Sequence, residues 1–413
     1  MTPEKIVLKN TLAATTGRGI DSLLAFVFFV WFSRIFGSVV LGKYAFAMSL
    51  SGLLCVAINL GLNNLMVREV SRDRTQSSSY VGTLLVTQGV LALVIWMAIW
   101  TIAWALPFDS VTAWILGILG TYHVFLRLSL IFSASFRAHE EMKFSAGLLV
   151  LHRTVILAFG IPVMLVWQEP ILTLASFPIG TIVMFVAGYL ICRKKYGSPD
   201  LRVNLPVAKR ALVAGMPFFA MIFLLQLHDR VGVILLSFFE SDPVVGAYSA
   251  AERILVTIGM VFQIFGGALL PALSRLSVQS RETARSLYRK SILTMLFVAV
   301  PLALLLALLS EQIIMVTFGG SFEGAIQVLR VLSISLVFVA LNQALLGFLV
   351  AEYHERAVAW IRAGAVGLHV LLSLLLIPKF SSIGLAYSHA ISMASLTAAL
   401  WLFVVKRVDR VDC

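Results

Sequence analysis

The residues of this chain that could do chemistry are ionisable side chains inside long apolar stretches. Each is costly in hydrocarbon, so it normally faces a partner or a water-filled cavity. They are Arg18, Asp21, Arg127, Arg153, Asp229, Arg230, Glu252, Arg253, Arg330 and Arg362. Guanidinium stays protonated and binds phosphate through paired hydrogen bonds. The arginine excess indicates a site for an anionic, phosphate-bearing substrate, whereas a carrier of cations is expected to show excess acid.

Some of these side chains could have a structural role in place of a functional one. Arg18 and Asp21 lie three residues apart on one helix face and are expected to pair. The segments 228–230 and 252–253 lie on consecutive helices, where their opposite charges could neutralise one another. Arg330 and Arg362 lie near predicted span ends, which favours snorkelling to the interface.

The candidate site residues fall into two groups, arginines that could bind substrate and acids that could couple an ion or pair with an arginine. Arg127 and Arg153 have no obvious acidic partner in the sequence, which favours a cavity role for both. The predicted cationic, substrate-binding cavity comprises Arg18, Arg127, Arg153, Arg230 and Arg253. Ion coupling or charge pairing is assigned to Asp21, Asp229 and Glu252. We interpret His123, His152 and His369 as packing or hydrogen-bonding residues, and we predict no catalytic residue, metal ligand or cofactor.

The composition defines the elements that must position these residues. Of 413 residues, 60% are hydrophobic and 13% are charged, and the mean hydropathy is +0.96. This excludes a single soluble core and disorder, and apolar runs near 20 residues favour helices over a barrel. The class is an all-α polytopic membrane protein. The predicted spans are 12–33, 43–65, 81–105, 112–135, 146–167, 171–191, 211–236, 244–269, 291–310, 325–350, 357–377 and 383–405.

The positions of Lys and Arg predict the topology. Of these 32 residues, 22 lie in segments on the side of the N-terminus, three lie on the other side and seven lie within spans. The positive-inside rule therefore places both termini in the cytoplasm, and the net charge of +12 faces anionic lipid rather than nucleic acid. The basic linker 192–210 divides the chain into an N-terminal six-helix lobe, 1–191, and a C-terminal one, 211–413.

A repeat supports two lobes around a central cavity. The segment Gly42–Ala47 (GKYAFA) matches Gly246–Ala251 (GAYSAA) at an offset of 204 residues. Each lobe has an even number of spans, so the two share one orientation and are related by an axis along the membrane normal.

Enzyme chemistry has little support in the sequence. No P-loop, zinc-protease or nucleophile-elbow motif occurs, and the outer loops are short. The cysteines, Cys55, Cys192 and Cys413, have no spacing that suggests a disulfide framework or a zinc site.

Several motifs together resemble the O-antigen and exopolysaccharide flippases of the polysaccharide transporter family, in the multidrug/oligosaccharidyl-lipid/polysaccharide (MOP) superfamily. They are Asp229-Arg230, Val244–Ile254, Pro271–Arg275, Phe318–Ala325, Leu329–Leu332, Gly42–Ala45, Leu60–Leu62 and Val67–Glu69. The resemblance spans the whole chain. Twelve spans fit this branch better than the fourteen of the lipid II flippases.

The resemblance implies translocation of an undecaprenyl-pyrophosphate-linked oligosaccharide across the cytoplasmic (inner) membrane. The expected mechanism is alternating access around a cationic cavity, driven by H⁺, Na⁺ or the membrane potential. Expected partners are the lipid-linked oligosaccharide, the bilayer and polysaccharide polymerase or export proteins.

Two other functions remain open. One is a cation-coupled multidrug or toxin extruder of the same superfamily, in which Asp21, Asp229 or Glu252 would couple the ion. The other is a membrane glycan polymerase or ligase.

Overall fold

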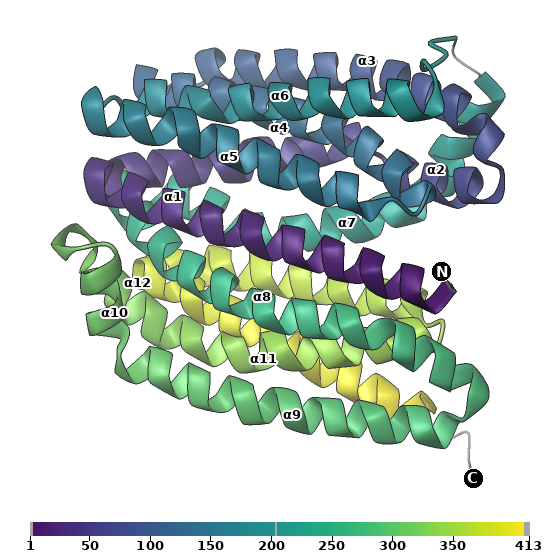
Figure 1. Ribbon diagram of the computed structural model, residues 1–413. Coiled ribbons are helices and arrows are strands. Elements are labelled where there is room, and N and C mark those ends of the chain that lie inside the picture. The colour runs from purple at the N-terminus through teal and green to yellow at the C-terminus, as the bar shows by residue number, and fades with distance from the viewer. Residues whose placement is uncertain (1–2, 203–204, 409–413) are drawn as a thin grey trace. The chain divides into compact units, whose positions relative to one another are not determined.

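The structure is a computed structural model that describes residues 3–202 and 205–408 (Figure 1). Every element in these ranges is helical, because in hydrocarbon a helix satisfies its own backbone hydrogen bonds. In chain order the elements are α1 (Pro3–Leu54), η1 (Cys55–Ile58), α2 (Leu62–Arg72), η2 (Arg74–Gln76), α3 (Ser77–Ala105), α4 (Ser110–Ala138), α5 (Met142–Val166), α6 (Pro170–Tyr196), α7 (Leu205–Phe239), α8 (Asp242–Gln279), α9 (Arg281–Leu308), α10 (Ser310–Thr317), η3 (Gly320–Phe322), α11 (Ala325–Ala351), α12 (Glu355–Phe403) and η4 (Val404–Val408).

Two helices are far too long to cross a membrane once. α1 has 52 residues and α12 has 49, whereas about 20 span the hydrocarbon. Gly37 interrupts α1 (φ 74°, ψ −175°) and Ser381 interrupts α12 (φ 54°, ψ −138°). Each helix therefore supplies two segments. Together with the eight other long apolar helices, the described chain has the twelve segments that the sequence predicts.

The second segment ends before the predicted limit of 65. α1 stops at Leu54, a 3₁₀ turn follows, and α2 begins at Leu62. Gly61, just before α2, has φ 75°, and a Cβ there would lie 2.2 Å from the carbonyl oxygen of Gly215 in α7. Hydropathy carries no signal for such a backbone contact. In the same way, part of the predicted outer loop 311–324 folds into α10 and η3.

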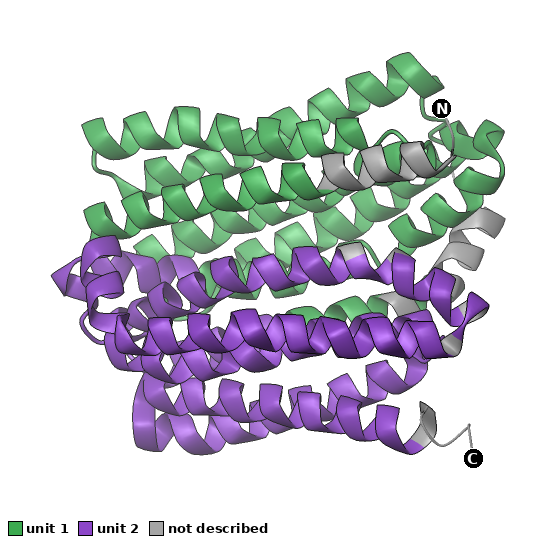
Figure 2. Ribbon diagram, turned by 60° about the horizontal axis from the view of Figure 1, so that its bottom comes forward, with its two compact units in different colours: residues 1–36, 46–226 green, residues 37–45, 227–413 purple. Residues whose placement is uncertain are grey.

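The described chain divides into two compact units (Figure 2). Unit 1 comprises residues 1–36 and 46–226, and unit 2 comprises residues 37–45 and 227–413. The division falls inside α7, and it assigns the stretch after Gly37 to unit 2. The lobe limits expected from the basic linker stay a prediction.

Unit 1 is built around α4, which contacts α2, α3, α5 and α6 (Figure 1). Phe132 and Phe136 of α4 are fully buried in its core. Gly117 lets α3 come close, since a Cβ there would lie 2.5 Å from the ring of Trp100. Unit 1 thus offers one central helix on which polar side chains from the surrounding helices can converge.

Unit 2 is built around α11, which contacts α8, α9 and α12. Phe348 of α11 stacks on Tyr288 of α9 with ring centroids 4.4 Å apart. The two halves of α12 meet closely after Ser381, because a Cβ at Gly384 would lie 2.3 Å from the carbonyl oxygen of Leu376. Both halves of α12 therefore contribute side chains to the same interior.

The sequence repeat corresponds to a reciprocal contact, all of whose residues belong to unit 2. A Cβ at Gly42 would lie 2.0 Å from the carbonyl oxygen of Asp242, and a Cβ at Gly246 would lie 2.0 Å from that of Ser38. The offset of 204 residues relates Ser38 to Asp242 just as it relates Gly42 to Gly246. Small residues let helix backbones approach closely in lipid. Lys43 adds an ion pair to Asp242 at 3.4 Å.

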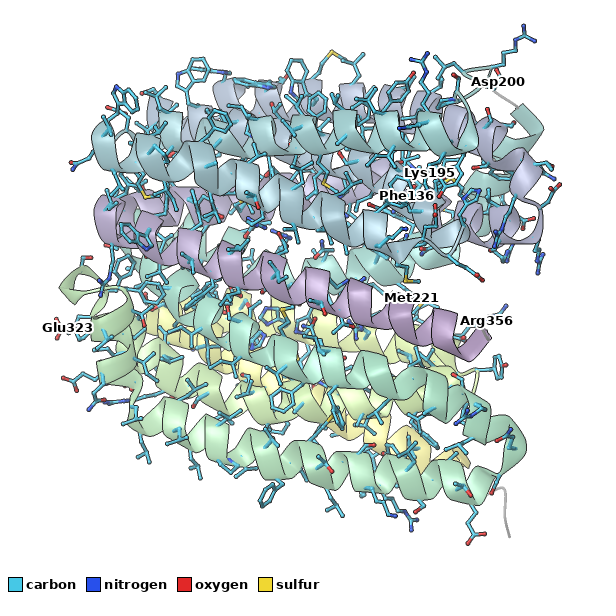
Figure 3. All side chains as sticks on the ribbon, in the orientation of Figure 1. Phe136, Lys195, Asp200, Met221, Glu323 and Arg356 are labelled. Atoms are coloured by element: carbon cyan, nitrogen blue, oxygen red, sulfur yellow. The ribbon has the colours of Figure 1, made fainter. Side chains whose placement is uncertain are left out.

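Basic segments meet at one end of unit 1. Lys195, labelled in Figure 3, and Tyr196 both bond the carboxylate of Glu141 at the start of α5. Arg74 lies 3.9 Å from Glu140. Burial alone would raise the pKa of Glu141, but the hydrogen bonds from Lys195 and Tyr196 and the nearby lysine charges lower that pKa below its ordinary value. These segments are ones that the sequence predicts to face the cytoplasm.

We expect the reciprocal crossing to tolerate no side chain. Gly42→Leu and Gly246→Leu should each lower the stability of the protein by about 1–3 kcal/mol or more, because the added carbons meet backbone that cannot move aside. The measurement is the thermal unfolding midpoint and the monodisperse yield in detergent. Gly367→Leu on α12 is the matched control, since a Cβ there meets nothing within 4 Å. Equal behaviour of all three variants would contradict the crossing.

Candidate functional site

The buried charge of unit 1 is an ion pair between α1 and α5. Arg153 donates from Nε to Oδ1 of Asp21 at 2.8 Å. The neighbouring His152 on α5 places its Nδ1 4.0 Å from the same oxygen, and its side chain is 2% exposed. The carboxylate therefore lies between a fixed guanidinium and an imidazole.

Aromatic rings pack beside the Asp21–Arg153 ion pair. Tyr122 of α4 stacks on the His152 ring with centroids 6.0 Å apart and an interplanar angle of 21°, and Phe177 of α6 meets the edge of Tyr122 at 5.2 Å. His123, the next residue of α4, has Nδ1 3.0 Å from the hydroxyl of Ser51. His123 thus forms a hydrogen bond, whereas His152 packs against Tyr122 and forms no hydrogen bond with another described side chain from either ring nitrogen.

The pairing in unit 1 differs from the expected one. The sequence predicts that Asp21 pairs with Arg18 and suggests no acidic partner for Arg153. In the structure, Asp21 forms its ion pair with Arg153. Arg18 is exposed and lies within electrostatic range of Arg137. The expected Arg18–Asp21 pair was wrong because the i,i+3 rule applies only within one helix. The partner of Asp21 lies on α5, 132 residues away in the sequence.

The charges of unit 2 gather on α7 and α8. Glu252 lies within electrostatic range of Asp229, Arg230 and Arg253. Asp229 is exposed, while the other three side chains are half-buried. The structure therefore brings together the four residues that the short connection between the two helices predicts to be neighbours. Which acid pairs with which arginine stays a prediction.

The remaining two arginines have different surroundings. Arg330 is exposed and donates from Nε to the hydroxyl of Ser310 at 2.9 Å, as expected for an interfacial group. Arg362 is half-buried and lies within electrostatic range of Asp229 and His228. Arg362 therefore adds to the charged group of unit 2, whereas its sequence position favoured snorkelling.

Unit 2 contains a histidine cluster that the sequence does not predict. Rings of His228, His369 and His389 lie 5.0–6.0 Å apart. The sequence places His228 in a charged segment and His369 among packing residues, and their closeness to His389 depends on the fold of α12. The available signal was that three of the seven histidines lie inside apolar stretches of the second half.

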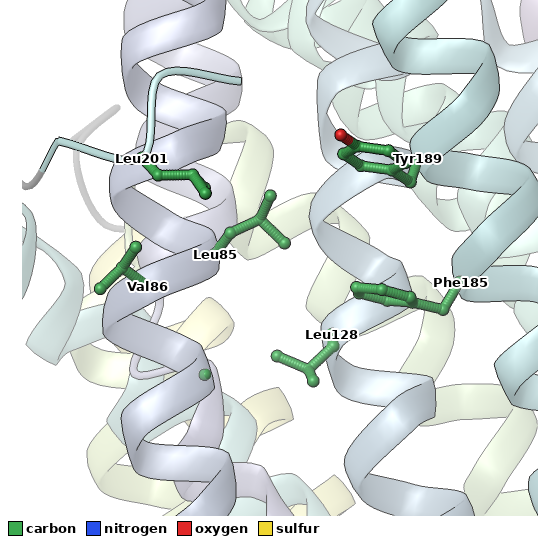
Figure 4. A pocket seen from close by; sticks show the side chains of 7 residues that line it. Leu85, Val86, Leu128, Phe185, Tyr189 and Leu201 are labelled. Atoms are coloured by element: carbon green, nitrogen blue, oxygen red, sulfur yellow. The ribbon is translucent and has the colours of Figure 1, made fainter. Parts of the chain in front are cut away.

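An apolar recess lies elsewhere in unit 1 (Figure 4). Its volume is about 400 Å³, and it lies among α3, α4 and α6 beneath Leu201. Its lining consists of Leu85, Val86, Gly89, Leu128, Phe185, Tyr189 and Leu201. It holds no charged side chain and is therefore unsuited to an anion.

The long apolar helices and the charges within them define the class, a multi-pass α-helical membrane protein. Its fold is shared by a structure of the lipid II flippase MurJ in an inward closed conformation, with a TM-score of 0.82, 16% identity, and coverage of 96% of this chain and 87% of that one. An inward-facing multidrug-resistance MATE transporter of the MOP superfamily has a TM-score of 0.77 and 14% identity, with 95% of each chain covered. The Vibrio cholerae MATE transporter VcmN has a TM-score of 0.66 and 16% identity, with 98% and 97% covered.

The family follows from the sequence match. The model of the polysaccharide biosynthesis protein family matches residues 7–277, well over half of the chain. The chain belongs to this family, in agreement with its resemblance to the polysaccharide transporters of the MOP superfamily. No curated protein matches it. The solved neighbours are described as a flippase and as transporters, and at these identities they show the fold alone.

We expect the Asp21–Arg153 pair to behave as one unit. Arg153→Gln or Asp21→Asn should each destabilise the protein by about 1.5–3 kcal/mol, since removal of one partner breaks a hydrogen bond between charged groups that are largely shielded from solvent. The double variant should be more stable than either single variant. The measurement is the unfolding midpoint in detergent or nanodiscs.

Arg18→Gln is the discriminating control for this pair. Arg18 lies one turn from Asp21 but is exposed, so its removal should cost little. If Arg18→Gln destabilises as much as Arg153→Gln, Asp21 has the partner that the sequence first suggested.

Proposed function

We propose that this protein is a flippase that moves an oligosaccharide linked to undecaprenyl pyrophosphate across the cytoplasmic membrane, for O-antigen or exopolysaccharide synthesis. One observation carries the proposal: positive charge remains within the spans after the acids are counted. In unit 1, Asp21 is held by Arg153, and Arg18 and Arg127 add further positive charge. The spans of unit 2 contain four arginines and two acids.

Pyrophosphate suits such surroundings because it stays anionic and must leave water to cross. Arginine is more weakly hydrated than lysine and matches phosphate geometry with paired donors. Arg127, Arg230 and Arg253 are half-buried within spanning helices. In the proposal they contact the pyrophosphate during alternating access, with Arg18 and Arg153 supplying further positive charge.

Multidrug extrusion is the competing function, and the MATE neighbours make it worth testing. An extruder of cationic drugs needs a carboxylate that is available to the drug or to the coupling ion. In unit 1 the acid of the spans is bound to Arg153 at 2.8 Å. Asp229 is exposed in unit 2 and is the residue on which an extruder would depend. A glycan polymerase or ligase is less well supported, because the outer segment 311–324 is short and largely folded into α10 and η3.

The test removes charge at the proposed phosphate contacts. Arg127→Ala, Arg230→Ala and Arg253→Ala should each reduce export about tenfold or more, equivalent to about 1.4 kcal/mol of lost binding. The lysine variants should keep part of the activity, because they retain a point charge. The measurement is complementation of a deletion strain, read as lipid-linked oligosaccharide remaining on the cytoplasmic leaflet.

Arg330→Ala is the matched control, since Arg330 is exposed and bonds Ser310. It should export normally at wild-type abundance. If the deletion strain accumulates no lipid-linked sugar but gains sensitivity to cationic drugs, the extruder replaces the flippase.

A further inference from the structure

Three imidazole rings meet inside unit 2. His228 comes from α7, His369 from the first half of α12 and His389 from its second half. The first two stack with centroids 5.0 Å apart and an interplanar angle of 11°. The His389 ring stands across both, with centroids at 6.0 and 5.9 Å. α11 closes the group with the hydroxyl of Ser335, 3.2 Å from Nδ1 of His389.

The cluster lies deep in the helices. His228 and His369 are 3% and 2% exposed. His369 precedes the break at Ser381 by 12 residues and His389 follows it by eight, which puts the two rings about 18 Å and about 12 Å along their helices from the turn. In a hydrocarbon layer about 30 Å thick, this is close to the midplane. Three titratable groups at that depth are unusual and mark a functional site by default.

Serine hydroxyls contact nitrogens of two of the rings. The hydroxyl of Ser388 lies 2.9 Å from the carbonyl oxygen of His369, 3.0 Å from Nδ1 of the same residue and 2.9 Å from the hydroxyl of Ser373. The hydroxyl of Ser392 lies 2.9 Å from the carbonyl oxygen of His389 and 3.4 Å from Nε2 of His228. A serine hydroxyl can donate or accept, so it can contact either protonation state of its ring nitrogen.

The Nε2 of His369 faces α7 at a glycine. A Cβ at Gly232 would lie 3.2 Å from this nitrogen. Among the described residues, no group of three His, Cys, Asp or Glu side chains is arranged to hold a metal ion. The rings of His228 and His369 pack face to face, so a charge on one ring acts directly on the other.

The three histidine rings and the charges around them favour the binding of one proton over two or three. Imidazolium rings in contact repel, so the first proton disfavours a second. The nearest charges on the packed helices are Arg362 of α12, Asp229 and Arg230 of α7, and Glu252 and Arg253 of α8. α11 brings only Arg330, which is bonded to Ser310, and the second half of α12, residues 382–403, brings no Asp, Glu, Lys or Arg. A proton on His228 would repel the guanidinium of Arg362, which lies within electrostatic range of Asp229.

We propose that His228, His369 and His389 form a single proton-binding site at mid-depth in unit 2, and that the proton is the coupling ion of transport. The role of the proton as coupling ion rests on the proposed function, whereas the binding of the proton does not. Protonation of His228 places a positive charge within range of Arg362 and so disfavours the position in which Arg362 neighbours Asp229. The state of the cluster therefore alters the charge that unit 2 offers to an anionic substrate.

The first experiment needs no substrate. Full-length protein with isotope-labelled histidine ring nitrogens is titrated in phospholipid nanodiscs by NMR across about pH 5 to 8, the range in which histidine ordinarily titrates. We expect the three signals to shift together with a total of one proton. The signals are assigned by His228→Gln, His369→Gln and His389→Gln. Rings that all stay neutral throughout the range would overturn the proton site.

The second experiment tests coupling in the same protein. Export of lipid-linked oligosaccharide is measured against external pH in cells that carry wild type, His369→Gln or His389→Gln. Wild-type export should change up to about tenfold per pH unit on one side of the transition, as expected for one titrating proton, and both cluster variants should give a flat profile. His139→Gln is the control, since its ring bonds the carbonyl oxygen of Ser135 at the end of α4 and lies outside the cluster.

The outcomes separate the two proposals. A cluster that titrates while the variants keep the wild-type pH profile overturns the proton as coupling ion. A deletion strain without accumulated lipid-linked sugar overturns the flippase, yet the NMR titration still decides whether the proton site exists.

Discussion

The cost of placing a charge in hydrocarbon is the constraint on which this structure depends. A lone ion at the centre of a bilayer is expensive, so each one must be paired or face water. Asp21 and Arg153 meet this demand by a direct bond of 2.8 Å between α1 and α5. The bond fixes the spacing of two helices, and the rings of Tyr122 and His152 then pack where the charge has been neutralised.

A second constraint is that lipid gives apolar faces little reason to associate, so helices adhere through close backbone approach. The crossing of Gly42 with Asp242, and of Gly246 with Ser38, shows how a repeated sequence meets that need twice with the same geometry. The break at Ser381 acts in another way, since it folds α12 back and brings His369 and His389 within 5.9 Å. The break at Ser381 thus brings two site residues of α12 together, and the small residues Gly42 and Gly246 let helix backbones cross closely.

These constraints explain which features a sequence can predict. Hydropathy and turn residues predicted the helical class and the twelve segments, because the length of a span is a local property. The short connection between α7 and α8 likewise predicted that Asp229 and Glu252 would be neighbours. The Asp21–Arg153 bond and the histidine cluster escaped prediction, because each joins helices whose register is decided by packing. The close approach of Gly61 to Gly215, 154 positions away, likewise has no local pattern in the sequence.

The two units answer the charge constraint differently, and the difference has a mechanistic consequence. In unit 1 the acid of the spans is bound to a guanidinium, which keeps its proton at every physiological pH, and a single imidazole, that of His152, lies 4.0 Å from the same carboxylate oxygen. In unit 2, Arg362 lies within electrostatic range of both Asp229 and His228, and the ring of His228 packs against two further imidazoles, whose charge can change in the physiological range. A transporter that must hold an anion and then release it needs an attraction that can be altered. The described residues offer that capacity in unit 2, where Arg362 and His228 act on one another and the carboxylate of Asp229 lies beside His228 in the chain.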